Sequence, residues 1–551
     1  MRYRNLIVFM MICSPVLLAQ AQSSGIPHLE KHGTATQLVV DGKPLLMLAG
    51  EVLNSSSSSL DYMRPIWPHL AAIQLNTVLT PLSWELIEPR EGQFDFTLVD
   101  GLIQDARRNN LHIVFLWLAS WKNGMSSYAP IWVKLNTQRF PRVIEKDGNP
   151  VEILSTLGKE SMEADARAFA AVMRHIREVD GEAHTVLMMQ VENEVAVLGD
   201  TRDRSAAANR EFDGQVPTEL MTYLQQHHDT LIPEFRKVWE AAGSKPSGTW
   251  EEVFGSGAET DKIFMAWNYG RYIQFVAAAG KAKYPLPMYT NAALIGPHPA
   301  PGHYSSGGPL PEVMDVWKAA GSALDIYAPD IYAPNFAEWC ERYARAGNPL
   351  FIPETGGAHH AASHAAEGAH AFYAIGQLEA IGFSPFGIDS FGEMVRDDTG
   401  VLPDEGNDLA KTYDVLMKLA PTIFQHEGKG EMAGFMFDED HPQTTVELNG
   451  YRLDVSLDKA FGAEAKTGYG LVIAVGPDEF LGAGTDFRVS FSPKAAGPAQ
   501  VGISWVEEGT FAGGVWVPGR RLNGDENAQG KFWRFSSKRI SVQKAVVYRY
   551  E

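Results

Sequence analysis

The sequence predicts an α/β fold, namely a (β/α)8 TIM barrel followed by a smaller all-β sandwich domain, and three observations lead to this expectation. The chain has 551 residues, more than one ordinary domain, and a (β/α)8 barrel can account for roughly 250 to 400 of them. Short apolar or β-branched segments alternate with longer segments of helical period, as in parallel strands covered by helices. From about residue 428 the pattern changes to the two-residue alternation of antiparallel strands.

Eight strand-like segments precede that change, and each is followed by a helical pattern. Their ranges are 45–50, 77–83, 112–118, 185–191, 286–292, 324–332, 349–355 and 384–390. In 160–180, Met162, Ala166, Phe169 and Ile176 recur at helical spacing, which predicts a helix with one buried face. Eight such units predict a closed barrel over residues 30–426, whose last helix covers 408–424.

The alternating region over 427–551 predicts the sandwich. Apolar residues occupy every second position before and after Asn449-Gly450, and this pattern is typical of two strands joined by a two-residue hairpin turn. Trp505, Trp516 and Trp533 are interpreted as core residues of this domain, with carbohydrate binding as the alternative.

Charge and the amino terminus limit the partners and the compartment. The net charge of −20, without any block of Lys or Arg, argues against nucleic acid and favours a neutral ligand.

Arg2 and Arg4, an apolar run and Ala19-Gln20-Ala21 predict a cleaved signal peptide over 1–21, hence a periplasmic or secreted protein with no membrane segment after cleavage. An uncleaved anchor and a lipoprotein signal at Cys13 are the alternatives. Cleavage leaves Cys340 as the one cysteine, so no internal disulfide is expected.

Two glutamates lie at the carboxyl ends of expected strands four and seven. Glu194 follows 185–191, and Glu354 lies in 349–355. The strand ends of a barrel meet at one mouth, so the two carboxyl groups can flank one glycosidic bond. Retaining hydrolysis needs such a pair about 5–5.5 Å apart, one to protonate the leaving oxygen and one to attack the anomeric carbon. The placement predicts Glu194 as general acid/base, with a raised pKa, and Glu354 as nucleophile.

Four further segments, together with these glutamates, resemble glycoside hydrolase family 35, part of the clan A barrels whose catalytic glutamates end strands four and seven. They are 84–89 (WELIEP), 92–96 (GQFDF), 117–124 (WLASWKNG) and 477–480 (PDEF). The chain is most similar to the bacterial branch with a C-terminal β-sandwich and β-galactosidase activity, some members of which remove galactose from xyloglucan side chains. In the first strand, Gly50-Glu51-Val52-Leu53-Asn54 departs from the aromatic-rich Gly-Glu-Phe-His-Tyr of better-known members.

Further polar and aromatic residues lie at the expected mouth. Substrate contacts are expected from Asn193, Tyr332, Trp121, Lys122, Asn123, Glu51, Trp84 and Asp389. Asn193 should bind the sugar 2-hydroxyl, and Tyr332 should keep the nucleophile ionised, with a strand-end cap and rim packing as the alternatives. For the other residues the alternative is loop anchoring. Glu192 points to the other side of its strand and is interpreted as structural.

The segment 196–260 is much longer than an ordinary βα loop and is expected to form a wall of the cleft. Trp239, Trp250 and Phe254 in it are either sugar platforms or local core. A walled cleft predicts exo action on a terminal galactose. His359, His360, His364 and His370 lie in an Ala-rich segment without acidic ligands, so no metal and no cofactor are expected.

The sequence therefore predicts a retaining exo-β-galactosidase that acts on galactosylated oligosaccharides. The alternatives are another clan A retaining enzyme (β-glucosidase, β-mannosidase or arabinosidase) and a carbohydrate-binding protein without activity. A homodimer is compatible with the sequence, which does not determine the oligomeric state.

Overall fold

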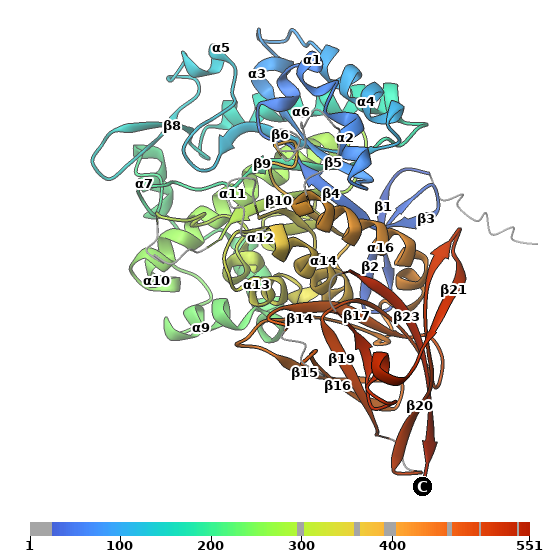
Figure 1. The fold of residues 1–551 in the computed structure, drawn as a ribbon. Helices are drawn as coiled ribbons and strands as arrows, with labels where there is room; N and C mark the ends of the chain where they lie inside the picture. The colour runs from blue at the N-terminus through green and yellow to red at the C-terminus, as the bar shows by residue number, and fades with distance from the viewer. Residues whose placement is uncertain are drawn as a thin grey trace, which may run out of the picture.

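The computed structural model describes residues 25–294, 302–356, 364–390, 404–459, 465–494, 497–536 and 539–551 (Figure 1). The expected signal peptide, 1–21, lies outside the described residues. No described helix combines the length and apolar character needed to cross a membrane.

Eight parallel strands close into the predicted barrel. In the order of the closed sheet they are β4 (Met47–Glu51), β5 (Thr77–Ser83), β6 (His112–Lys122), β9 (Val186–Asn193), β10 (Met288–Ala293), β11 (Ile326–Ile331), β12 (Ile352–Thr355) and β13 (Gly382–Pro385). Each of the eight expected segments overlaps one of these strands, so the fold class is confirmed. The last strand differs most, because it ends at Pro385 and leaves Asp389 in the loop that follows.

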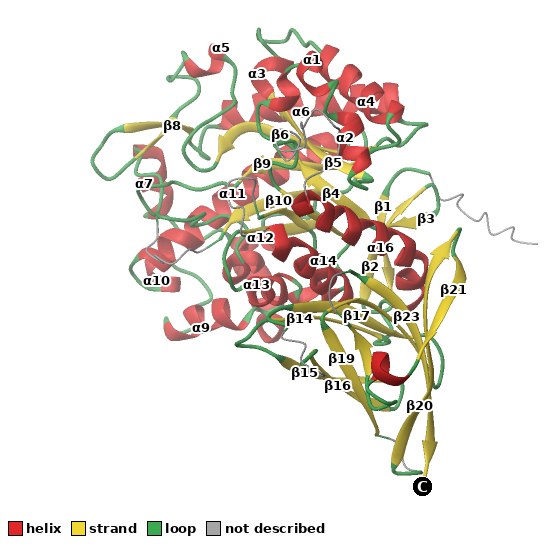
Figure 2. Cartoon of the chain, in the orientation of Figure 1, coloured by secondary structure: helices red, strands yellow, loops and turns green. Residues whose placement is uncertain are grey.

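Helices surround the barrel (Figure 2). The α-helices outside 196–260 are α1 (Leu60–Met63), α2 (Trp67–Ala72), α3 (Trp84–Ile87), α4 (Thr97–Arg108), α5 (Ile131–Lys134), α6 (Lys159–Asp180), α11 (Ala258–Lys281), α12 (Met314–Ala319), α13 (Phe336–Tyr343), α14 (His364–Leu378) and α16 (Asp404–His426). Short 3-10 helices are η1 (Ser56–Ser58), η2 (His228–Thr230), η3 (Pro311–Val313), η4 (Arg345–Gly347) and η6 (Gly524–Asn527). The helix predicted over 160–180 is α6, whose apolar face is buried against the barrel.

Four helices form the long segment after β9: α7 (Ala206–Phe212), α8 (Thr218–Gln226), α9 (Pro233–Ala241) and α10 (Trp250–Phe254). Its first residues contact loops at the strand ends, because Leu198 N–H donates to Gly124 O at 3.3 Å and Arg204 N–H donates to Ile144 O at 2.7 Å. The side chains of Trp239, Trp250 and Phe254 are buried in the hydrophobic core of this region. Their interpretation as sugar platforms is therefore wrong, since they have no exposed face.

Five strands were not expected from the sequence. An antiparallel sheet of β1 (His28–His32), β2 (Ala35–Val40) and β3 (Lys43–Leu45) precedes the barrel, and β7 (Arg142–Ile144) pairs with β8 (Pro150–Leu154). Leu38 and Val40 of β2 share a buried cluster with every second residue of barrel strands, such as Ile326 and Ala328. Since alternate strand residues point to the same side, this cluster fills the barrel interior, and the N-terminal sheet closes its amino end.

The C-terminal region is a β-sandwich. One sheet holds β14 (Met432–Phe437), β17 (Gly468–Ala474), β18 (Glu479–Thr485), β23 (Ser541–Tyr550), β20 (Gln500–Ala512) and β21 (Val515–Leu522); the other holds β15 (Gln443–Leu448), β16 (Tyr451–Leu457), β19 (Phe487–Pro493) and β22 (Trp533–Phe535). The hairpin at Asn449-Gly450 is confirmed by the register Leu448↔Tyr451. Trp533 is buried between the sheets, as the core interpretation requires.

The sandwich packs against the barrel through α14, which contacts β14 and β17 (Figure 1). The two elements approach closely at Gly434 of β14, where an added Cβ would lie 2.7 Å from the backbone oxygen of Phe372. A glycine at this position therefore allows the strand to lie directly on the helix.

Candidate active site

Glu194 directly follows β9, the fourth barrel strand. The strand is buried along its whole length, and Glu194 is itself buried, with 7% of its surface exposed. Its φ of 45° is left-handed, a conformation that non-glycine residues adopt only where neighbours hold them. One such neighbour is Asn291 of β10, whose Oδ1 accepts a hydrogen bond from the Glu194 N–H at 3.1 Å.

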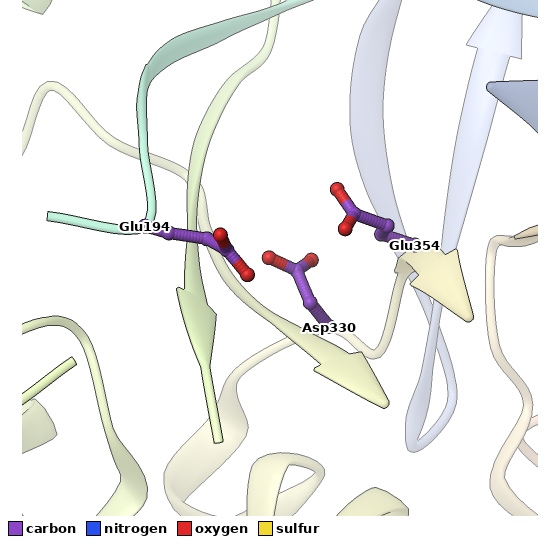
Figure 3. Close-up of side chains that lie close together, drawn as sticks. All are labelled: Glu194, Asp330 and Glu354. Atoms are coloured by element: carbon purple, nitrogen blue, oxygen red, sulfur yellow. The ribbon is translucent and has the colours of Figure 1, made fainter. Parts of the chain in front are cut away.

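Glu354 lies in β12, the seventh strand, and faces the same site (Figure 3). An oxygen of Glu194, one of Glu354 and one of Asp330 all lie within 4.8 Å of one another. Glu354 Oε1 accepts a hydrogen bond from the Tyr332 hydroxyl, and Oε2 has no hydrogen-bond donor among the described residues. The nucleophile candidate thus has one oxygen held by a phenol and one oxygen uncommitted.

Burial and neighbouring charge set the protonation of the site. Burial, followed by the carboxylate of Glu354, raises the pKa of Glu194 to about 7, against the lowering effect of Lys122. Burial and then Glu354 also raise the pKa of Glu51 well above its ordinary value. Close buried carboxyl groups cannot all ionise, so Glu194 is available as a proton donor near neutral pH.

Amides connect the strand ends beside the glutamates. Asn193 Oδ1 accepts from Gln190 Nε2 at 2.9 Å and from Asn291 Nδ2 at 3.1 Å, and Asn193 Nδ2 donates to Asn123 Oδ1 at 3.4 Å. These contacts fix the orientation of the amide group, because its oxygen already has two donors. Nδ2 donates one hydrogen to Asn123, so its second N–H is the part of Asn193 that can meet a ligand oxygen.

The structure brings most of the expected site residues together. Glu51, Lys122, Asn193 and Tyr332 join the two glutamates through the hydrogen bonds and electrostatic contacts described above. Asn123 is exposed beside Asn193.

Three expected contacts are not supported by the structure. The Trp84 side chain is fully buried and donates its indole N–H to Glu88 at 2.8 Å. Trp121 is fully buried and donates to the backbone oxygen of Leu154 at 3.0 Å. Asp389 accepts from the Leu53 N–H at 3.0 Å and from the Ser56 hydroxyl at 2.5 Å, so it caps a loop. Each side chain is committed to the protein, and the alternative of local anchoring is the better interpretation.

Glu192 lies on the other side of β9, as expected. Its carboxyl oxygens accept from the backbone N–H groups of Ser120 at 3.0 Å and Trp121 at 2.9 Å. Asp165 of α6 lies beside it and accepts from Trp117 Nε1 at 2.9 Å and the Ser120 hydroxyl at 2.6 Å. This second pair of carboxyl groups ties β9 to β6 and α6.

The trio of Glu194, Asp330 and Glu354 is, within the described ranges, the one group of acidic, His or Cys side chains close enough to share an ion. A pair of carboxyl groups can carry out retaining hydrolysis without a metal, and an acidic cluster alone does not show a metal site. His359, His360 and the His364 side chain lie outside the described residues. The His370 ring stacks on Phe336 with centroids 4.0 Å apart, and burial lowers its pKa to about 4.

Asp330 and Asn291 belong to the site but were missed from the sequence. Both are polar residues near the carboxyl ends of apolar barrel strands, β11 and β10. That signal was present, because a carboxylate or amide inside a barrel strand needs a buried partner. The motifs point to the strand ends themselves, whereas Asp330 lies one residue and Asn291 two residues before the end of its strand.

Comparison with known proteins supports a glycosidase barrel. Residues 66–266 match the family model of glycoside hydrolase family 42, described as "Beta-galactosidase". A β-galactosidase of Xanthomonas manihotis is 34% identical over 82 residues, which are 14% of this chain and 14% of that enzyme. The chain is therefore similar to glycoside hydrolases of the β-galactosidase type. The family 35 assignment expected from the motifs is not confirmed, because the model that matches belongs to family 42.

Other matches add less. Residues 409–534 match a domain of unknown function (DUF5597). The β-galactosidase of the psychrophilic Marinomonas ef1 has a TM-score of 0.44 at 11% identity, covering 68% of this chain and 60% of that one. The catalytic domain of a Paenibacillus polymyxa β-amylase has a TM-score of 0.45 at 11% identity, covering 66% and 97%. Neither structure bears on the reaction of this chain.

Proposed function

We propose that the protein is a retaining, exo-acting β-galactosidase with Glu194 as general acid/base and Glu354 as nucleophile. The observation that carries the proposal is the oxygen separation of at most 4.8 Å between these residues at the ends of strands four and seven. Retaining enzymes place the two carboxyl groups about 5–5.5 Å apart, whereas inverting enzymes need about 6.5–9.5 Å to admit a water. The match of residues 66–266 to a β-galactosidase family supports the choice of sugar.

In the first step Glu194 gives its proton to the glycosidic oxygen while Glu354 attacks the anomeric carbon. The bond to the leaving group breaks, and a glycosyl ester of Glu354 forms. In the second step the ionised Glu194 takes a proton from water, the water oxygen bonds to the anomeric carbon, and Glu354 leaves as a carboxylate. The Asn193 N–H group is suited to bind the sugar 2-hydroxyl, and the Tyr332 hydroxyl stabilises the charge on Glu354.

Exo action and a galactosylated xyloglucan oligosaccharide as substrate are the finer parts of the proposal. The segment after β9 bridges the loops at Gly124 and Ile144, so it borders the mouth on the side of β6. A bordered mouth admits a chain end more readily than a continuous polymer. The acidic chain, with a net charge of −20, does not disfavour a neutral glycan.

A panel of nitrophenyl β-glycosides, followed by a galactosylated xyloglucan oligosaccharide, tests the proposal. We expect the galactoside to be cleaved fastest, the β-anomer of the sugar to appear first by NMR, and free galactose to leave an intact backbone. The Glu354→Gly variant, purified in parallel, controls for contaminating enzymes. Release of the α-anomer would contradict retention, preference for another glycoside would contradict the sugar, and shortened backbones without galactose would contradict exo action.

A further inference from the structure

A third carboxyl group lies between the two proposed catalytic glutamates (Figure 3). Asp330 is on β11, where Ile326 and Ala328 belong to the interior cluster of the barrel. Two-residue alternation therefore turns Asp330 inward as well. It is the direct neighbour of Glu354 in the register of β11 and β12, and only 1% of its surface is exposed.

The hydrogen bonds of Asp330 are incomplete in a way that points to a proton. Its Oδ2 accepts from Asn291 Nδ2 at 2.7 Å. Among the described residues no donor reaches Oδ1, although this atom is buried. An oxygen of Glu194 and an oxygen of Glu354 each lie within 4.8 Å of an Asp330 oxygen. Two carboxyl groups can hydrogen bond only if one of them carries a proton.

The surroundings of Asp330 are mostly acidic. The ionisable groups around Asp330 come from several elements. They are Glu51 on β4, Lys122 on β6, Glu194 after β9, Tyr289 on β10, Tyr332 after β11, Tyr343 on α13 and Glu354 on β12. Lys122 is the one cation in this set. Burial, and then the charges of Glu354, Glu194 and Glu51, raise the pKa of Asp330 well above its ordinary value.

The proposed reaction moves a negative charge across Asp330. Before the first step Glu354 is ionised and Glu194 is protonated; in the glycosyl ester, Glu354 is neutral and Glu194 is ionised. The charge thus changes sides twice in each cycle, between two groups whose oxygens both lie within 4.8 Å of an Asp330 oxygen. A neutral carboxylic acid in that position can donate to either side.

We propose that Asp330 keeps a proton throughout the cycle and donates it in a hydrogen bond to whichever of Glu194 and Glu354 is ionised. This inference rests on the proposed function. Asp330 is a positioning residue here, because it neither touches the substrate nor transfers its proton in net. Asn291 holds Asp330 Oδ2, the Glu194 N–H and the Asn193 amide, so one side chain orients the whole group. A hydrogen bond to a charged group of this kind corresponds to about a 10- to 100-fold effect on rate.

Two variants separate a protonated Asp330 from an ionised one. Asp330→Asn has the shape of the neutral acid and can still donate an N–H, so it should recover most of the kcat that Asp330→Ala loses and should leave the upper limb of the pH profile in place. Asp330→Ala removes the donor, and kcat for an activated aryl glycoside should fall about 10- to 100-fold. If Asp330→Asn loses as much rate as Asp330→Ala, or moves the upper limb downward, Asp330 is ionised and the proposal fails. Wild-type rates for Asp330→Ala would also overturn it.

An infrared measurement keeps the proposal testable without turnover. The wild-type enzyme at pH 6 should show the carbonyl band of a buried protonated carboxyl group that is absent from Asp330→Asn, and identical spectra would overturn the proposal. This comparison needs no substrate, so it is independent of the sugar assignment. If the glycoside panel identifies another sugar, the kinetic test is run on that glycoside. Should Asp330→Ala fail to fold, Asp330→Asn and the infrared band decide the matter.

Discussion

Two groups of buried carboxyls lie on opposite sides of strand β9, and they are built differently. The outer pair, Glu192 and Asp165, accepts hydrogen bonds from two backbone N–H groups, an indole and a serine hydroxyl. The inner cluster, Glu194, Asp330 and Glu354, has two carboxyl oxygens without a donor among the described residues. Both groups are buried to a similar degree.

The difference shows how burial alone fails to distinguish structure from catalysis. Buried polar groups are normally hydrogen bonded, because leaving one unpaired costs about 1–3 kcal/mol. The outer pair follows this rule and connects β9 to β6 and α6. The inner cluster departs from it, because Glu354 keeps one oxygen free for the proposed attack on the sugar and Asp330 keeps one free beside the two glutamates. Incomplete hydrogen bonding, together with burial, marks the candidate site.

The largest expected effect comes from removing the proposed nucleophile of the inner cluster. Glu354→Gly should lower kcat on the order of 10⁴-fold, because no group replaces the carboxylate that attacks the anomeric carbon. Added azide should restore turnover and give a glycosyl azide of inverted configuration, which NMR identifies. Near-wild-type activity without azide would show that Glu354 is not the nucleophile.

Neighbouring positions on β9 allow a direct comparison of the inner cluster and the outer pair. Glu194→Gln should lose about 10²- to 10⁴-fold on an oligosaccharide, whose leaving group needs protonation, and much less on a nitrophenyl glycoside in the first step. Glu192→Gln, two residues away, makes the same substitution in the outer pair and should retain activity close to wild type. Rates with both substrates measure the contrast. Equal losses of rate in the two variants would show that the substitutions act by distorting β9, and would contradict the role of Glu194 as proton donor.

The inner cluster should also set the upper limb of the pH profile. Burial and Glu354 raise the pKa of Glu194 to about 7, so the proton donor is present below this pH and is lost as the pH rises through it. We expect kcat/KM to fall above pH 7 by about tenfold per unit. Initial rates from pH 5 to pH 9 at low substrate concentration give the limb. If the upper limb of the pH profile persists in the Glu194→Gln variant, the limb belongs to another ionisable group.

The smallest expected effect on turnover, and a measurable one on stability, belongs to the outer pair. Glu192→Ala leaves the backbone N–H groups of Ser120 and Trp121 without their acceptors. We expect the free energy of unfolding to fall by about 1–3 kcal/mol, measured by urea denaturation. Asp389→Asn serves as a comparison at another buried carboxyl, which also accepts a backbone N–H. An unchanged midpoint in Glu192→Ala would show that the outer pair does not support the fold.

Much of the architecture follows from the sequence, because a barrel repeats one strand and helix pattern. The predicted segment 77–83 coincides with β5, and 160–180 lies within α6. The same repeat located Glu194 and Glu354, since both stand at strand ends where the hydrophobic pattern stops. Local alternation also predicted the hairpin at Asn449-Gly450.

Residues whose role depends on tertiary neighbours could not be assigned in this way. Trp84 and Trp121 lie next to the mouth in sequence, yet both indoles turn into the core and bond to other segments. Asp389 accepts hydrogen bonds from Leu53 and Ser56, which are far away in the chain. The three-stranded sheet β1–β3 has short strands with mixed burial and gives little periodic signal.

Leu38 and Val40 of β2 pack into the barrel interior and close its amino end, so in the proposed mechanism substrate and products pass through the carboxyl end alone. The departing alcohol and the incoming water must then use the same opening at the carboxyl ends of the strands. Any alcohol that lingers there stands where water has to arrive, and it can accept the sugar from Glu354 instead. In the proposed mechanism, the ratio of hydrolysis to transfer to a second sugar therefore depends on how long the alcohol occupies the opening.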